Sequence, residues 1–368
     1  MTTYKSQVAL SLMPSFNNAL CCEFINRLGG IDAMFKENEN AYNALCREYN
    51  YQTRSYNRSE ALKLLDKELK AIEDNEISIC CVEDDKYPAL LSQIVDHPLV
   101  FYYKGDIDFQ ASTTFLSIVG TRNSSSLYRD RVTEIVSYLS RCSSDIIIVS
   151  GLAYGIDAAS HKAALDNKLR TFSVLGHGLD KVYPSTHINL SKDILTSAGA
   201  LISEFPCSLG IHGSNFLKRN RIVAGLSLAT LVAESAIKGG SMTTARLALS
   251  YDREVYALPG RPNDKCSSGC NMLIKQNVAY LVENGEDVAL MLKLKEPLRE
   301  SPQQLSLFED DPDMELLYDI IKEKGQCSVD ELFQLSCLSH GKVLGLTLQL
   351  EMQNRITCLP GNTYVVKC

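Results

Sequence analysis

The amino-acid sequence predicts an α/β protein whose core is a mostly parallel β-sheet, with a small helical domain before it and a winged-helix-like domain after it. Three observations predict this class. The chain has 368 residues, which exceeds one ordinary hydrophobic core and favours two or three domains. Its composition, with 45% hydrophobic and 22% charged residues, is that of a soluble globular protein. Between about Thr113 and Leu290, short apolar runs without polar alternation alternate with helical stretches, which is typical of parallel strands buried on both faces.

Residues 1–75 are predicted to form the helical domain. Its expected helices are Gln7–Leu12, Ala19–Leu28, Ile31–Phe35, Ala41–Arg47 and Arg58–Ile72. The turn Leu28-Gly29-Gly30-Ile31 is compatible with a helix-hairpin-helix unit, which holds a DNA phosphate on backbone amides, but tight helix packing requires the same glycines. Residues 76–112 are expected to be strands and turns that connect this domain to the core.

The core is expected to span residues 113–292. Its predicted strands are Phe115–Gly120, Asp145–Ser150, Arg170–Gly176, Gly199–Phe205, Leu228–Glu234, Arg253–Leu258 and Val278–Glu283. Most of these runs are followed by Gly or Ser and then by a helical stretch. Because ligands of such sheets bind beyond the carboxyl ends of the strands, these loops are the expected functional site.

A linker rich in Pro, Gln, Asp and Glu is predicted over residues 293–313, and a winged-helix-like domain over residues 314–368. The expected elements of this domain are helices Met314–Lys324, Ser328–Leu335 and Ser339–Gln353, then strands Ile356–Leu359 and Tyr364–Lys367. From Asp310 onward, five basic minus nine acidic residues give a net charge of −4. A winged helix that reads DNA would normally be basic, so protein contact or support of a dimer is favoured.

A cluster of cations stands out against the net charge of −7. Residues 216–221 read Phe-Leu-Lys-Arg-Asn-Arg, at the start of an otherwise apolar helical stretch. Lys218, Arg219 and Arg221 suit a phosphate backbone, and Phe216 suits a base stacked on its ring. The alternative is a solvated helix start, which the helix dipole disfavours because cations are unfavourable at a helix N-terminus.

Three further strand-end loops have the composition of anion-binding loops. They are Val119–Ser124, Ser150–Asp157 and Lys238–Thr244. The first offers the Arg122 guanidinium, which can bind a phosphate bidentately. The other two are Gly-rich and open helices, whose free amides attract anions. Glycines often serve only tight turns, but four such loops in one sheet predict a phosphate-binding rim.

Catalysis and metal binding are the competing uses of polar residues. Asp157 and His161 have the spacing of an acid–base pair on one helix, although Asp157 is more simply a cap or a partner of the helix dipole. Further possible acids or bases are His177, Glu204 and Glu234. No serine or cysteine is framed as a nucleophile, and no carboxylate cluster would hold magnesium. The prediction is therefore a protein that is not an enzyme and has no cofactor.

Cysteine usage and hydropathy indicate the compartment. The thirteen cysteines are scattered among apolar segments, which indicates reduced thiols in a cytoplasm. Cys266 and Cys270 lack the two further ligands that a zinc site needs. No signal peptide is recognisable at the N-terminus, and no apolar run approaches the roughly 20 residues that span a bilayer. A cytoplasmic protein without membrane contact is expected.

A series of motifs resembles the DNA-processing protein DprA (Smf) family, near-continuously from about Ser117 to Val288. In the order of the family, the matching segments are Gly120–Arg122, Ser150–Asp157, Val174–Pro184, Ile202–Pro206, Arg219–Ser227, Gly240–Ala245 and Ala257–Gly260. The resemblance implies a Rossmann-like core that binds single-stranded DNA and forms a homodimer. It also implies protection of incoming strands in natural transformation and loading of the recombinase RecA onto them.

The positions expected to bind the strand follow from the loops and from this resemblance. They are Gly120, Thr121, Arg122, Ser150, Gly151, Phe216, Lys218, Arg219, Asn220, Arg221, Lys238, Gly239, Gly240, Ser241 and Thr243. The four arginine and lysine side chains at 122, 218, 219 and 221 are expected to line one groove. His212-Gly213 stands where the family often has a lysine or proline, so one cation is missing.

The alternative is a nucleotide-processing enzyme related to phosphoribohydrolases, which shares a similar core and a Gly-Gly loop. Such enzymes use a glutamate just after that loop, where this chain has Ala245 and Arg246. A plain protein–protein adaptor is a third reading, against which the concentration of charge in strand-end loops weighs.

Two short segments predict protein partners. Met272, Leu273 and Ile274 resemble the segment by which the family dimerises, although packing of an apolar helix face explains them equally. Gln304, Leu305, Leu307 and Phe308 resemble the pentapeptide by which bacterial DNA-handling proteins dock on the replicative sliding clamp. The alternative for this segment is that its apolar side chains cover a sheet edge or the winged helix.

Overall fold

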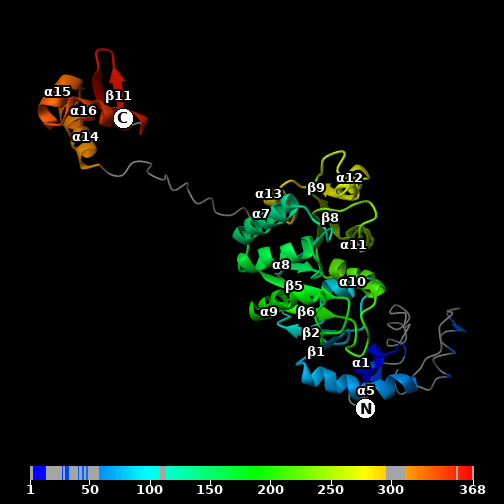
Figure 1. The fold of residues 1–368 in the computed structure, drawn as a ribbon. Helices are drawn as coiled ribbons and strands as arrows, with labels where there is room; N and C mark the ends of the chain where they lie inside the picture. Colours follow the sequence, from blue (N-terminus) through cyan, green and yellow to red (C-terminus); the bar gives the residue numbers. More distant parts are fainter. Residues whose placement is uncertain are drawn as a thin grey trace. The chain divides into compact units, whose positions relative to one another are not determined.

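The structure is a computed structural model that describes residues 3–13, 27, 30–32, 40, 44, 47–48, 58–107, 113–295, 311–353 and 355–366 (Figure 1). The chain divides into two compact units, residues 1–298 and 299–368, each with its own core. No helix among the described residues is long and apolar enough to cross a membrane.

A nine-stranded sheet forms the centre of the first unit, in the order β1-β2-β6-β5-β4-β3-β7-β8-β9 (Figure 1). The strands are β1 (Ser78–Cys81), β2 (Val100–Gly105), β3 (Thr114–Val119), β4 (Ile146–Ser150), β5 (Arg170–Leu175), β6 (Ala200–Ser203), β7 (Ala229–Val232), β8 (Glu254–Ala257) and β9 (Tyr280–Leu281). Neighbours from β6 to β9 pair in parallel, whereas β1 and β2 pair antiparallel at one edge. The predicted fold class, a mostly parallel sheet flanked by helices, is confirmed.

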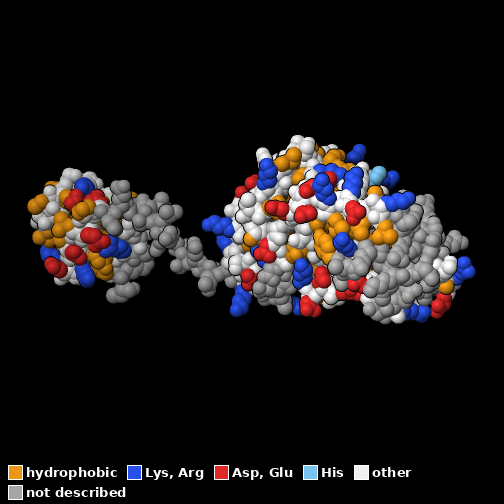
Figure 2. All heavy atoms as spheres, turned by 90° about the horizontal axis from the view of Figure 1, so that it is seen from below, with side chains coloured by type: hydrophobic (Ala, Val, Ile, Leu, Met, Phe, Trp, Pro, Cys, Tyr) orange, Lys and Arg blue, Asp and Glu red, His pale blue; other side chains and the backbone are white. Residues whose placement is uncertain are grey.

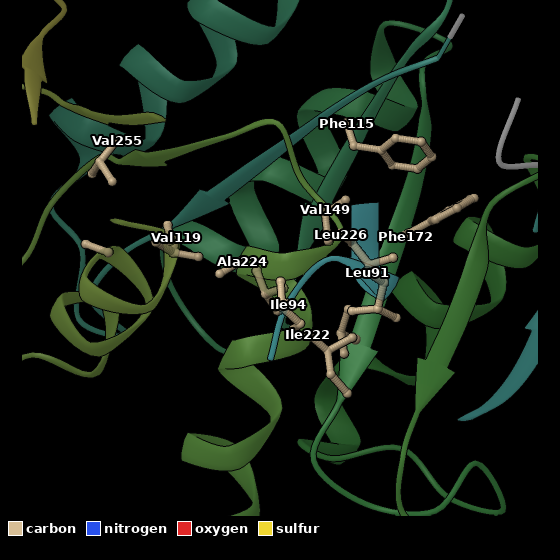
Figure 3. Close-up of a cluster of buried hydrophobic side chains, with 14 of the residues drawn as sticks. Leu91, Ile94, Phe115, Val119, Val149, Phe172, Ile222, Ala224, Leu226 and Val255 are labelled. Atoms are coloured by element: carbon tan, nitrogen blue, oxygen red, sulfur yellow. The ribbon is translucent and has the colours of Figure 1, made fainter. Parts of the chain in front are cut away.

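Helices cover both faces of this sheet. They are α6 (Ala89–Ser92), α7 (Ser126–Cys142), α8 (Ile156–Asp166), α9 (Ile188–Thr196), α10 (Gly213–Gly225), α11 (Gly240–Ser250), α12 (Ser268–Lys275) and α13 (Gly285–Met291), with a short 3-10 turn at Ser185–His187. Alternate residues of a strand point to opposite faces, so Leu116 and Ile118 of β3 pack with α7, α8 and α13. Phe115 and Val119 pack instead with α10 and α11 (Figure 3). Burial on both faces explains why the strands are apolar without alternation.

The N-terminal part contributes helices α1 (Thr3–Ser11) and α5 (Arg58–Asp74), which pack on each other, and α1 also packs on β2. Val8, Ala61 and Tyr102 belong to one buried cluster of these elements. The helix-hairpin-helix prediction falls mostly outside the described residues. Of its described part, the Ile31 amide donates a hydrogen bond of 3.0 Å to Glu83 Oε1. That amide therefore serves the fold rather than a phosphate.

The second unit is a winged helix. Its helices are α14 (Pro312–Lys324), α15 (Val329–Ser336) and α16 (His340–Met352), and its sheet has the order β10 (Cys327–Ser328), β12 (Thr363–Val366), β11 (Ile356–Leu359). Helix α15 begins with a capping box, in which the Ser328 and Glu331 side chains each accept from the other's backbone amide. Leu317, Leu332 and Leu350 join the helices in a common core. The wing is the β11–β12 hairpin, which turns at Gly361 with a φ of 93°.

Candidate nucleic-acid interface

Strand-end loops of the first unit surround a pocket of about 310 Å³, here called the Arg122 pocket. It lies beyond the carboxyl ends of β3, β4 and β7, where the topology of the sheet places ligand sites. Of the residues predicted from the sequence, it is lined by Gly120, Thr121, Arg122, Phe216, Arg219, Asn220, Gly239, Gly240 and Ser241. The structure thus brings three loops of the expected rim, and the start of α10, to one site.

Glycines let the loops interlock. Gly155 has a φ of 78°, and a Cβ there would lie 2.3 Å from the Thr121 carbonyl oxygen. That carbonyl accepts a hydrogen bond of 3.3 Å from the Ile156 amide at the start of α8. A Cβ on Gly120 would lie 2.4 Å from Ile156 Cγ1. Each glycine is therefore required by a close approach of the β3 loop to α8.

Arg122 is the exposed cation of this pocket. Its guanidinium lies over the Phe216 ring, 5.9 Å from the ring centroid. The Phe216 ring also contacts Tyr183 at a centroid distance of 5.6 Å and His177 at 6.5 Å. Tyr183, which is 48% exposed, was not among the predicted site residues. The signal that could have found it is its place in another strand-end loop of the same sheet, the one after β5.

Arg219 does not offer its charge to a ligand as the sequence predicted, because it is only 5% exposed. Its Nη1 donates to the carbonyls of Gly151, at 2.8 Å, and Val174, and its Nε donates to Asn220 Oδ1 at 3.2 Å. A Cβ on Gly151 would lie 2.3 Å from Arg219 Nη1, so this glycine makes room for the guanidinium. Burial raises the pKa of the nearby Asp157 carboxyl, and the charge of Arg219 opposes that rise.

The loop after β4 is likewise not the open anion site that its glycines suggested. The Ala153 amide donates to Asp157 Oδ2 at 3.3 Å, and the Ile156 amide donates to Thr121. Ser150 is buried, and its hydroxyl donates to the Ile118 carbonyl at 2.7 Å. These hydrogen bonds stabilise the loop, and the Ala153 and Ile156 amides are used within the protein rather than offered to an anion.

Lys218 and Arg221 lie on the other side of α10, so the four predicted cations do not line one groove. Both line a second pocket of about 570 Å³ with residues of α1 and α5. The Arg221 side chain is 12% exposed, forms an ion pair with Glu204 and donates to the Asp96 carbonyl. In a helix, residues two positions apart point in different directions. This periodicity separates Arg221 from Arg219.

The fourth predicted loop presents the start of α11 to the Arg122 pocket. Gly239 caps the helix without a side chain, and Gly240 and Ser241 line the pocket. The first amides of a helix have no acceptor within it, and the helix dipole is positive at this end. Lys238 is exposed beside this turn, and Thr243 is half-buried on the helix. The helix start and Arg122 together favour a phosphate group.

Comparison with known proteins decides the family. Residues 78–293 match the DNA recombination-mediator protein A family, and residues 301–362 match the DprA winged helix domain. The chain belongs to the DprA family. Protein Smf of Escherichia coli strain K12 is 34% identical over 283 residues, which cover 76% of this chain and 75% of that protein. DNA processing protein DprA of Streptococcus pneumoniae is 38% identical over 205 residues, which cover 56% and 71%.

Solved structures of the family agree with the fold. The X-ray structure of DprA from Streptococcus pneumoniae aligns with a TM-score of 0.62 at 30% identity, and covers 80% of this chain and 99% of that one. A Helicobacter pylori DprA structure aligns with a TM-score of 0.53 at 26% identity, and covers 60% and 97%. Its title describes a single-stranded DNA binding mode of that protein. Membership in the DprA family gives the chain a role in DNA processing and recombination.

The two residues with the spacing of an acid–base pair, Asp157 and His161, each have another partner. Asp157 lies in the first turn of α8, and its carboxylate accepts from the Ala153 amide. His161 is fully buried, and its Nδ1 lies 2.7 Å from Thr171 Oγ1. Burial, then the charges of Arg219 and His187, lower the pKa of His161 to about 3. The imidazole is therefore neutral near pH 7.

A pH dependence of stability follows from His161. Its pKa is near 6.5 in an unfolded chain and about 3 in the fold, so the unfolded state binds an extra proton between these values. The unfolding free energy is therefore expected to fall as the pH decreases from about 6.5 toward 3. His161→Asn should flatten this part of the profile in urea titrations at several pH values. His340→Gln, at an exposed histidine, is the control; an unchanged slope in His161→Asn would contradict the assignment.

The remaining predicted residues are placed as follows. Leu273 is buried in the core, and Met272 and Ile274 are partly buried against the same cluster. Cys266 is exposed and Cys270 is buried, and no group of three or more potential metal ligands occurs among the described residues. The segment Gln304–Phe308 lies outside the described residues, so its clamp-docking prediction stays a prediction.

Proposed function

We propose that the Arg122 pocket binds single-stranded DNA. The single observation that carries the proposal is the exposed Arg122 guanidinium, which lies over the Phe216 ring beside the start of α11. Proteins that bind single strands combine cations that follow the backbone with aromatic rings on which bases stack. The strand's phosphate would lie at Arg122 and the first amides of α11, and a base would stack on the Phe216–Tyr183 side.

A single strand fits this arrangement better than a duplex. The ring available for stacking is half-buried within a pocket, so a base must leave any stack of its own to contact it. Unpairing a base costs a few kcal/mol in a duplex and far less in a single strand. Fluorescence anisotropy with labelled oligo-dT and a matched duplex, at several salt concentrations, tests this. Equal affinity for both at every salt concentration would contradict the proposal.

Phe216→Ala is expected to weaken oligo-dT binding by about 1–3 kcal/mol, because a stacked base loses its aromatic partner. The salt dependence of the affinity should stay unchanged, since no cation is removed. Leu217→Ala is a matched control, because Leu217 is the next residue, is 53% exposed and also lines the pocket. If both variants bind as the parent does, the base does not stack at Phe216.

The proposal extends to the roles that the family resemblance implies, namely protection of incoming strands and loading of RecA in natural transformation. A strand whose backbone lies in the pocket has fewer accessible phosphodiesters. Nuclease protection of oligo-dT, and RecA filament assembly on single strands with and without the protein, measure the two roles separately. Where a phosphoribohydrolase has its catalytic glutamate, this chain has the buried Ala245 and the exposed Arg246. Because neither residue is an acid, binding is favoured over nucleotide hydrolysis.

We further propose a homodimer that uses the partly buried Met272 and Ile274. Leu273 is buried in the core of its own chain, whereas Met272 and Ile274 are only partly buried there, and the exposed part of each could contact a partner. Two pockets in one assembly would raise the affinity for a long strand through avidity. Light scattering that shows only monomers at tens of micromolar protein would contradict this part of the proposal.

A further inference from the structure

Helix α16 of the winged helix exposes an apolar face. Val343, Leu346 and Leu350 pack into the core of the unit. On the opposite side, Leu344 and Leu348 are 43% and 57% exposed, and Met352, at the end of the helix, is 68% exposed. Residues four positions apart in a helix lie on one face. These three side chains therefore form a single exposed stripe, here called the α16 stripe.

Two glycines lie in the same stripe. Gly341 and Gly345 precede Leu348 by seven and three residues, which places them on its side of the helix. A Cβ added at either glycine would meet nothing within 4 Å. A glycine inside a helix costs about 1 kcal/mol relative to alanine, and no neighbour among the described residues of this unit requires either one. The space above them is therefore open to another segment or molecule that packs on this face.

The charges around the stripe favour a protein over DNA. From Leu344 to Met352 the exposed side chains are uncharged, and Glu351, at the border, accepts a hydrogen bond from the Cys358 amide. The nearby Lys342 forms an ion pair with Asp313. A helix that reads the major groove presents Arg, Lys, Asn or Gln to the base edges. The α16 stripe presents leucines and a methionine instead.

We propose that the α16 stripe packs against the α16 stripe of a second copy of this chain. A two-fold interface requires a surface that is complementary to itself. The stripe meets this requirement because it carries both projecting leucines and glycine gaps. When two such helices cross, the leucines of each can enter the gaps of the other, and the helix axes can approach closely. Other exposed apolar side chains of the winged helix also occur at its surface (Figure 2), but in the described part of the unit no other helix carries both exposed leucines and open glycines along one face.

Charge and area set the strength of this contact. The described part of the unit is acidic, since residues 311–366 have four basic and eight acidic residues. Two copies therefore repel each other, and the repulsion is smallest where uncharged surfaces meet, as at the α16 stripe. A standard interface has about 20–30 residues a side, and the stripe has five. The contact is thus a weak one that adds to other links between two copies.

Photo-crosslinking of the full-length protein tests the occupant directly. A photoreactive phenylalanine replaces Met352, at the end of the stripe, in a mixture of ¹⁴N- and ¹⁵N-labelled chains at high protein concentration. The expected cross-link joins residues 340–352 of two chains that carry different isotopes. Cross-links to the first unit, to residues 296–310, or only within one chain would overturn the proposal, as would the absence of any cross-link.

Gly345→Leu separates a fitted interface from a merely apolar surface. The substitution adds apolar area in open space and a better helix former, so the fold should tolerate it. If the leucines of one helix enter the glycine gaps of the other, the side chain added at position 345 blocks a gap. Self-association of this unit should then weaken about tenfold, as measured by the yield of the same cross-link against protein concentration. Leu316→Glu, at a 43% exposed leucine of α14, should leave the cross-link unchanged. A higher yield in Gly345→Leu would overturn the proposal.

Discussion

Arg122→Met is expected to weaken binding of oligo-dT by about 1.5–3 kcal/mol, roughly 10- to 150-fold, because a charge-assisted hydrogen bond to the DNA backbone is lost. Arg122 is exposed in the pocket, and its guanidinium lies over the Phe216 ring. Among the described residues it has no ion-pair partner. Removal of one phosphate contact should also reduce the slope of log affinity against log salt by about 0.7. Anisotropy titrations at several salt concentrations measure both quantities.

A matched control excludes a general effect of net charge. Arg131→Met removes an exposed arginine of α7, which forms an ion pair with Glu134 and does not line the Arg122 pocket. Its affinity and salt slope should equal those of the parent. If Arg122→Met and Arg131→Met behave alike, the strand does not follow the Arg122 pocket.

Arg219→Met is expected to lower the free energy of unfolding by about 3–5 kcal/mol, because the nearby Asp157 loses the charge that compensates its burial. Asp157 is 7% exposed, and the carbonyls of Gly151 and Val174 would lose their shared donor. Urea denaturation followed by circular dichroism measures the change. A loss below about 1 kcal/mol, the range of exposed ion pairs, would show that Arg219 and Asp157 do not stabilise each other in a buried environment.

The double variant distinguishes structural support from contact with DNA. Asp157→Asn removes the buried carboxyl group with which Arg219 interacts, so Arg219→Met should cost less in the Asp157→Asn background than in the parent. The folded double variant should keep the parent's salt slope for oligo-dT, since Arg219 touches protein carbonyls rather than phosphates. A slope reduced by about 0.7 would instead place Arg219 on the strand.

Much of the core could be predicted from the sequence, because strands of a parallel sheet that are buried on both faces appear as continuous apolar runs. Apolar runs such as 146–150, each followed by a glycine or serine loop, indicated the strands and the edge at which the pocket lies. The antiparallel strands β1 and β2 were expected only as a connection. Their place beside β6 depends on long-range pairing that no local pattern records.

The environment of individual arginines could not be predicted from composition. Arg122, Arg219 and Arg221 look alike in the sequence, yet one is exposed, one donates to buried carbonyls and one pairs with Glu204. Helical spacing could have shown part of this. Phe216, Arg219 and Asn220 have i, i+3 and i+4 spacing and share a face. Which face is buried depends on the tertiary contacts of α10.

Helix α10 is held in place on two of its sides by hydrogen bonds and an ion pair within the protein itself. Arg219 holds the carbonyls that follow β4 and end β5, and Arg221 holds the Asp96 carbonyl and Glu204. Preorganisation of this kind leaves little protein motion to be lost on binding. Most of the conformational entropy lost on complex formation would then be that of the nucleic acid. Hydrogen exchange of the α10 amides should therefore be equally slow with and without a bound strand.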